Sequence, residues 1–149
     1  MGAFNKILLC YDSSREGRRA LIQGAELAQQ VGAETHLLAV APRLGTMVDA
    51  PSALAMSHQE KDIKEVLHEG VERLRSRGLV AKGHLVFGTA MDEIPAVAQQ
   101  LGVDLIVIGH RPCGPIARWW AGPGNAQLLD RVACSILVSI DPEDFDGGG

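Results

Sequence analysis

The sequence predicts an α/β protein with one five-stranded parallel sheet in a single domain and helices on both faces of the sheet. Three observations lead to this fold class. Short apolar runs alternate with longer helix-like segments along the chain. The apolar runs are unbroken, as in strands that are buried on both faces. The length of 149 residues suits one domain.

The five predicted strands are short apolar runs, which are typical of the buried strands of a parallel sheet. In chain order they cover residues 6–11, 35–40, 80–88, 104–109 and 135–140. The predicted domain spans residues 1–140. The remaining residues, 141–149, read DPEDFDGGG and are predicted to form a disordered acidic tail.

The first two predicted helices follow the first and second strands. The first helix has a capping box of Ser13 and Glu16 at its start and an apolar stripe that continues to Val31. A loop over residues 41–52 precedes the second helix, which ends near Gly78. Ser52 and Ser57 are alternative caps for its start.

Two shorter helices complete the predicted fold. The third covers residues 90–102, and Pro95 is expected to bend its first turns because proline cannot donate the helical hydrogen bond. The fourth ends near Val132, just before the last strand. The alternation of strands and helices predicts right-handed crossovers between parallel strands.

The composition excludes several classes of protein. A net charge of −4 argues against a general role on nucleic acids or membrane surfaces, both of which favour a basic face. Three cysteines, an odd number, do not suggest a disulfide framework. No apolar run approaches the ~20 residues of a membrane span, and the first residues have no secretory signal. We therefore expect a reduced, cytoplasmic protein.

The stretch GHRPCGPIARWWAGPG, residues 109–124, follows the fourth strand. Glycines at a strand end allow backbone N–H groups to approach a phosphate closely, whereas prolines remove such groups. Ligands of parallel sheets bind beyond the carboxyl ends of the strands. Asp12, Val40 and Gly109 all lie at such ends. The sequence therefore predicts a nucleotide-type pocket whose phosphate loop is altered.

At this point the chain resembles the universal stress protein family over residues 4–140. The segments that carry the resemblance are KILLCYDSS, ETHLLAVAP, GVDLIVIGH and RVACSILVSI. The resemblance implies the strand order 3-2-1-4-5 with two helices on each face of the sheet. It also implies a homodimer that pairs the last strands, Ile136–Ile140, across a two-fold axis. A binding module for stress response or regulation, rather than an enzyme, is the function that it implies.

The family's ATP-binding members carry the motif G-x2-G-x9-G-[S/T] after the fourth strand. Here Gly109 and Gly122 match its first and third glycines, while Pro112 and Pro123 stand in place of the second glycine and of Ser or Thr. A second register, which ends at Gly124 and Asn125, fits part of the pattern. Arg111 and Arg118 are candidates to pair with phosphate.

The resemblance also places the base end of the site. Asp12 matches the aspartate that contacts the adenine side, and Val40 matches the backbone position that helps to hold the base. The predicted cofactor-binding residues are therefore Asp12, Val40, Gly109, Arg111, Gly122, Gly124 and Asn125. The predicted ligand is ATP, bound weakly or not at all, because Pro123 lacks both the N–H and the hydroxyl of the motif.

Other chemistries find less support in the sequence. His110 and Cys113 have H-x2-C spacing but no third ligand nearby, so no metal site is predicted. Asp12 has no nearby base, so no catalytic residue is predicted. The alternative function is an enzyme that hydrolyses or transfers nucleotides on the related adenine-binding α/β fold. The roles of Trp119 and Trp120, stacking on a base or packing the loop, stay open. The other histidines, His36, His58, His68 and His84, are expected to form no cluster.

Overall fold

A computed structural model of the chain describes residues 4–12, 15–41, 53–110, 128 and 131–140. For residues 15, 16, 53–60 and 110 it describes the backbone alone. Ser13 of the predicted capping box, most of the loop before the second helix and the predicted tail 141–149 lie outside the described residues.

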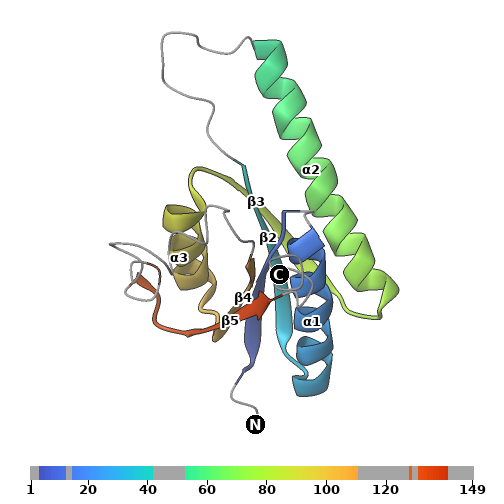
Figure 1. Cartoon of the computed structure of the whole chain (residues 1–149), viewed down its shortest axis with the longest axis vertical. Helices are drawn as coiled ribbons and strands as arrows, with labels where there is room; N and C mark the ends of the chain where they lie inside the picture. The colour runs from blue at the N-terminus through green and yellow to red at the C-terminus, as the bar shows by residue number, and fades with distance from the viewer. Residues whose placement is uncertain (1–3, 13–14, 42–52, 111–127, 129–130, 141–149) are drawn as a thin grey trace, which may run out of the picture.

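The sheet has five parallel strands in the order β3-β2-β1-β4-β5. The predicted fold class and strand order are therefore confirmed, and β3 and β5 are the two edges (Figure 1). Each strand lies within two residues of its predicted position. The strands are β1 (Lys6–Cys10), β2 (Glu34–Ala41), β3 (Ala81–Phe87), β4 (Leu105–His110) and β5 (Ser135–Ile140).

Three described helices cover the sheet. They are α1 (Arg15–Val31), α2 (Ala53–Ser76) and α3 (Ala90–Leu101). Figure 1 shows the sheet between α3 on one side and α1 with α2 on the other. The start of α2 at Ala53 favours Ser52 over Ser57 as the point where this helix begins. Leu128 and Arg131, in the predicted fourth helix, have helical backbone.

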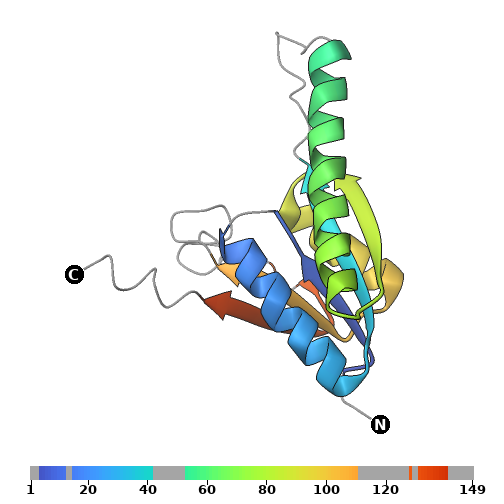
Figure 2. The same ribbon diagram turned by 90° about the vertical axis from the view of Figure 1, so that its right-hand side faces the viewer.

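The helix α2 is longer than the strands that it covers. Its 24 residues span about 36 Å at 1.5 Å per residue, and its amino-terminal part extends past the sheet (Figure 2). Within the described residues, no helix is long and apolar enough to cross a membrane.

Two apolar clusters form the core, one on each face of the sheet. Alternate residues of the same strands supply both clusters, because successive side chains of a strand point to opposite faces. On β1, Ile7 and Leu9 pack under α1 and α2, whereas Leu8 packs under α3. All three are at most 1% exposed. Burying such side chains stabilises the fold by about 1.5–3 kcal/mol each.

Glycines let the two long helices approach the sheet closely. A Cβ atom at Gly24 on α1 would overlap the side chain of Leu9. At Gly70 on α2, a Cβ atom would lie 2.5 Å from Leu37 Cδ2 and 3.0 Å from the ring of Tyr11. Because protein interiors are closely packed, larger residues at either position would push the helix away from the sheet. The close approach explains why a helix-breaking residue type is found inside each helix.

Candidate functional site

The carboxyl ends of the strands meet at the point where the strand order reverses. β1 lies between β2, to which the chain crosses first, and β4, which comes much later in the sequence. Cys10 is in register with Leu38 on β2, and Leu9 is in register with Val107 on β4. Asp12 therefore follows β1 at the level where both neighbouring strands end. Ligands of open α/β sheets bind outside the sheet at this switch point.

Val40 and Gly109 lie on the two strands that flank β1. Val40 is the penultimate residue of β2, pairs with Val86 on β3, and packs partly buried against the core beneath α3. Gly109 is the penultimate residue of β4 and pairs with Ser139 on β5. Asp12, Val40 and Gly109 therefore lie together at the carboxyl end of the sheet, at the ends of three adjacent strands.

The Asp12 carboxyl group is exposed at the carboxyl end of the sheet, and its negative charge affects the pKa of the Cys10 thiol. Burial and, to a smaller degree, the Asp12 carboxylate together raise the pKa of Cys10 to about 12. Cys10 is partly buried against the core beneath α3, so it is a small core residue, as its position in a strand predicts. This edge therefore presents a carboxylate to solvent above an unreactive thiol.

The phosphate end of the predicted site lies outside the described residues. This applies to Arg111, Gly122, Gly124 and Asn125, and also to the residues that depart from the motif or flank it. The latter are Pro112, Cys113, Arg118, Trp119, Trp120 and Pro123. The role of the loop in binding phosphate stays a prediction.

The start of α3 lies at the same edge and carries a polar cluster that the sequence analysis missed. The backbone N–H of Asp92 donates to Thr89 Oγ1 at 3.3 Å, and the Thr89 hydroxyl donates to Asp92 Oδ2 at 2.9 Å. Arg131 Nη1 lies 2.7 Å from Asp92 Oδ1. The hydrogen bonds from Arg131 and then from Thr89 hold the pKa of Asp92 below its ordinary value. Threonine three residues before an acidic residue is a capping signal that the sequence already contained.

Arg131 also approaches the carbonyl group that Pro95 leaves without a helical donor. Proline has no N–H, so the Met91 carbonyl oxygen has no partner one turn later. Arg131 Nη1 lies 3.5 Å from that oxygen. The helix continues through Pro95 from Ala90 to Leu101. Arg131 therefore links the segment before β5 to the first turn of α3.

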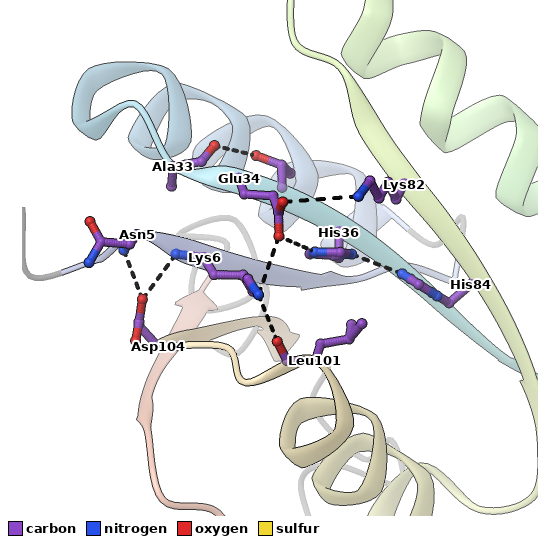
Figure 3. A network of polar contacts seen from close by, with 10 residues as sticks. Asn5, Lys6, Ala33, Glu34, His36, Lys82, His84, Leu101 and Asp104 are labelled. Carbon is purple, nitrogen blue, oxygen red and sulfur yellow. Dashed lines mark hydrogen bonds and ion pairs between the residues drawn. The ribbon is translucent and has the colours of Figure 1, made fainter.

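A second polar cluster lies at the opposite end of the sheet, near the amino ends of β2 and β3 (Figure 3). His36 Nδ1 lies 2.9 Å from His84 Nε2, and His36 Nε2 lies 2.9 Å from Glu34 Oε2. His36 is only 3% exposed. The expectation that the histidines form no cluster is therefore wrong for His36 and His84. They are 48 residues apart in sequence, and only the pairing of β2 with β3 brings them together.

Two lysines lie beside the carboxylate of this second cluster. Lys6 Nζ lies 3.5 Å from Glu34 Oε2 and donates to the Leu101 carbonyl at 2.9 Å, while Lys82 Nζ lies 4.0 Å from Glu34 Oε1. The hydrogen bond from His36 is the largest cause that lowers the pKa of Glu34. Within the described part of the chain, no group of three or more His, Cys, Asp or Glu side chains has an arrangement that would hold a metal ion.

A cavity of about 240 Å³ lies between α1 and α2. Arg18, Arg73 and Arg77 line it. Glu69 lies within 3.6 Å of both Arg18 and Arg73, and Glu26 lies 4.0 Å from Arg77. Each guanidinium group therefore already has a carboxylate nearby, and the cavity is a poorer candidate for an anion site than the strand ends.

The fold is shared with solved universal stress proteins. One from Burkholderia pseudomallei has a TM-score of 0.73 and 22% identity, with 93% of this chain and 97% of that chain covered. One from Archaeoglobus fulgidus, in complex with dAMP, has a TM-score of 0.68 and 19% identity, with 93% and 99% covered. One from Arabidopsis thaliana, with AMP bound, has a TM-score of 0.65 and 16% identity, with 94% and 93% covered.

The sequence itself has relatives of the same kind. It is 23% identical over 145 residues to the universal stress protein YxiE of Bacillus subtilis, with 91% of this chain and 98% of the relative covered. The family model described as "Universal stress protein family" matches residues 3–139. Since this match covers nearly the whole chain, the protein belongs to the universal stress protein family.

Proposed function

We propose that this protein is a regulatory module of the stress response that acts by binding an adenine nucleotide, and that it is not an enzyme. The single observation that carries the proposal is the meeting of Asp12, Val40 and Gly109 at the switch point of the sheet. Structures of the same fold contain AMP and dAMP. The proposed setting is the cytoplasm.

The base end of the proposed site is formed by β1 and β2. The Asp12 carboxylate is exposed and can accept hydrogen bonds from a ribose or from an adenine amino group. The backbone beside Val40 can bond the edge of the base, while its side chain packs into the core. Val40 lies on β2 and Asp12 follows the end of β1, and both strands have a neighbour on each side, so the base end is preorganised.

The phosphate end is proposed to favour a short phosphate chain. Pro123 replaces the Ser or Thr of the ATP-binding motif and so supplies neither an N–H nor a hydroxyl donor. Each missing hydrogen bond to a charged phosphate costs about 1.5–3 kcal/mol of binding free energy. We therefore expect AMP to bind and ATP to bind no more tightly than AMP.

Calorimetric titration of the protein with AMP and with ATP tests the proposal. Asp12→Ala is expected to weaken AMP binding, whereas Asp62→Ala, which removes an exposed carboxylate on α2, leaves it unchanged. Pro123→Ser is expected to strengthen ATP binding by about 2–4 kcal/mol, because it restores two donors. Absence of AMP binding would reject the nucleotide function, and submicromolar ATP binding by the wild type would reject the role of the prolines.

A phosphate-release assay separates this proposal from the alternative enzyme. We expect no release of phosphate from ATP above the rate of a buffer control. Sustained turnover that Asp12→Ala abolishes would instead favour a nucleotide-hydrolysing enzyme.

The proposed module is a homodimer paired through β5. This strand is an edge of the sheet, and its Leu137 and Ile140 are 38% and 47% exposed. An exposed apolar edge favours pairing with a second copy. Leu137→Lys is expected to increase the monomer fraction in sedimentation, whereas Ile22→Lys, at a 37% exposed position on α1, is not. A wild-type monomer at high concentration would reject the dimer.

A further inference from the structure

The histidine cluster of β2 and β3 has no part in the proposed nucleotide site. His36 lies four residues before Val40 on β2, which corresponds to about 13 Å along an extended strand. Figure 3 shows the two imidazole rings in line with the Glu34 carboxylate. The ring centroids of His36 and His84 are 5.1 Å apart. The cluster therefore needs an explanation of its own.

The hydrogen bonds fix the positions of the protons in the neutral pair. A carboxylate can only accept, so His36 Nε2 carries the proton that it donates to Glu34 at 2.9 Å. A neutral imidazole has one N–H, which leaves His36 Nδ1 as an acceptor. His84 Nε2 must then carry the proton in the 2.9 Å contact with His36 Nδ1. In the neutral pair, His84 donates to His36 and His36 donates to Glu34.

The pair accepts one additional proton but not two. With one proton added, one ring is an imidazolium that donates across the contact to the other ring, so the hydrogen bond persists. With two added, His36 Nδ1 and His84 Nε2 both carry hydrogens and both rings are cations. Two donors cannot form a hydrogen bond at 2.9 Å, and the like charges repel.

The surrounding charges act unequally on the two rings. Glu34 on β2 accepts the hydrogen bond from His36, while Lys6 on β1 pairs with the same carboxylate. Lys82 on β3 disfavours a positive charge on His84. At the end of α3, the facing group is the Leu101 carbonyl, which accepts from Lys6.

Burial, His36 and Lys82, in that order of size, lower the pKa of His84. Just below pH 6.5, a histidine whose pKa is lowered in the folded state binds less proton there than the same histidine binds in the unfolded chain. Stability is therefore full above this pH and falls as the pH drops below it.

From this geometry we infer that the His36–His84 contact is an acid-sensitive attachment of the edge strand β3 to β2. β3 has a strand neighbour on one side only, so it can detach without breaking the rest of the sheet. The detached state binds both protons and the attached state binds one at most. Acidification therefore favours detachment of β3 through proton uptake alone.

Amide hydrogen exchange at pH 7.5 and pH 5.5, corrected for the intrinsic exchange rate, tests the inference. The opened state takes up about one more proton, and pH 5.5 lies about one unit below the ordinary histidine pKa of about 6.5. The protection factors of the β3 amides should therefore fall about tenfold between these pH values. Those of β1, at the centre of the sheet, should stay within about twofold.

Two variants separate the pair from a general effect of acid. In His84→Gln, the side-chain amide can donate to or accept from His36 in either protonation state, so the acid-dependent loss in β3 should disappear. His68→Gln, which removes an exposed histidine on α2, should keep the wild-type loss. Equal protection of β3 at both pH values in the wild type, or an unchanged loss in His84→Gln, would overturn the inference.

A spectrum of the wild type provides a test that needs no variant. Long-range proton–nitrogen correlation of the imidazole groups at pH 7.5 should show a hydrogen on Nε2 of both His36 and His84. A hydrogen on Nδ1 and none on Nε2 of His84 would contradict the proton positions and with them the inference. Binding of AMP is a separate measurement, so failure of the nucleotide proposal leaves this result unaffected.

Discussion

Asp104 joins the starts of three strands, and its replacement should weaken the whole sheet. Its Oδ2 accepts the backbone N–H groups of Asn5 at 2.8 Å and of Lys6 at 3.0 Å (Figure 3). Its own N–H donates to the Lys6 carbonyl at 2.8 Å, and its carbonyl accepts from Ser135 at 3.2 Å. One side chain at the start of β4 therefore holds the entry of β1, while its backbone bonds both β1 and β5.

The expected cost of Asp104→Ala follows from these two side-chain hydrogen bonds. A hydrogen bond to a charged group contributes about 1.5–3 kcal/mol. The Asn5 bond is exposed, so water can replace the carboxylate there, whereas the Lys6 bond is partly buried and is lost without compensation. We expect a loss of about 2 kcal/mol for alanine. For Asp104→Asn, which keeps an oxygen acceptor, we expect about 1 kcal/mol.

Urea denaturation and calorimetry measure both variants. For a chain of this size, 2 kcal/mol corresponds to a decrease in Tm of about 4–8 °C. Asp62→Ala, an exposed carboxylate on α2, is the matched control and should change stability by less than about 0.5 kcal/mol. If Asp104→Ala were as stable as this control, the carboxylate would not be holding the entry of β1.

A second readout is independent of unfolding. Burial and, to a smaller degree, the Asp104 carboxylate raise the pKa of the Cys134 thiol. Asp104→Asn removes that charge, so the Cys134 pKa should fall towards its ordinary value in a variant with serine at the other two cysteines. An unchanged thiol titration would refute the proximity of the two groups.

Three further predictions concern single groups. The Tyr11 hydroxyl is buried, and Arg18 lies near enough to lower its pKa but makes no hydrogen bond of good geometry with it, so Tyr11→Phe should leave the denaturation midpoint unchanged or raise it. Arg131→Ala should raise the pKa of Asp92 towards its ordinary value in an NMR titration. Because this pKa is lowered in the folded state, the interaction with Arg131 stabilises the fold at neutral pH, and this stabilisation is lost as the pH falls through the folded-state pKa of Asp92. Cys10, with a pKa of about 12, should resist iodoacetamide at pH 8 in the native Cys113→Ser variant and react only after denaturation, as peptide mass spectrometry would show.

The strands and helices could be predicted from the sequence because each is encoded locally. The run DLIVIG and the stripe of α1 carry their periods within one window of residues. The strand order came from the family resemblance, since local patterns do not state which strands pair. Asp12, Val40 and Gly109 could be placed at one edge for a related reason: carboxyl ends of parallel strands share an edge.

The polar contacts across the sheet could not be predicted, because register determines them. Asp104 meets Asn5 across 99 residues, and His36 meets His84 across 48. A weak signal was present: Glu34 and His36 are polar residues two apart at the start of a buried strand. Two-residue spacing places such side chains on one face, but it does not identify what they meet there.

The position of β1 at the centre of the sheet also has a consequence for synthesis on the ribosome. β1, β2 and β3 all precede residue 88, so this half of the sheet can assemble while the rest of the chain is still being made. β4, which covers the other side of β1, begins at Leu105. At about 5–20 residues per second, the open edge of β1 waits several seconds after its own emergence for that partner. During this interval one edge of β1, which is buried in the finished fold, is exposed on the nascent chain. A chaperone that shields exposed strand edges would act on it then.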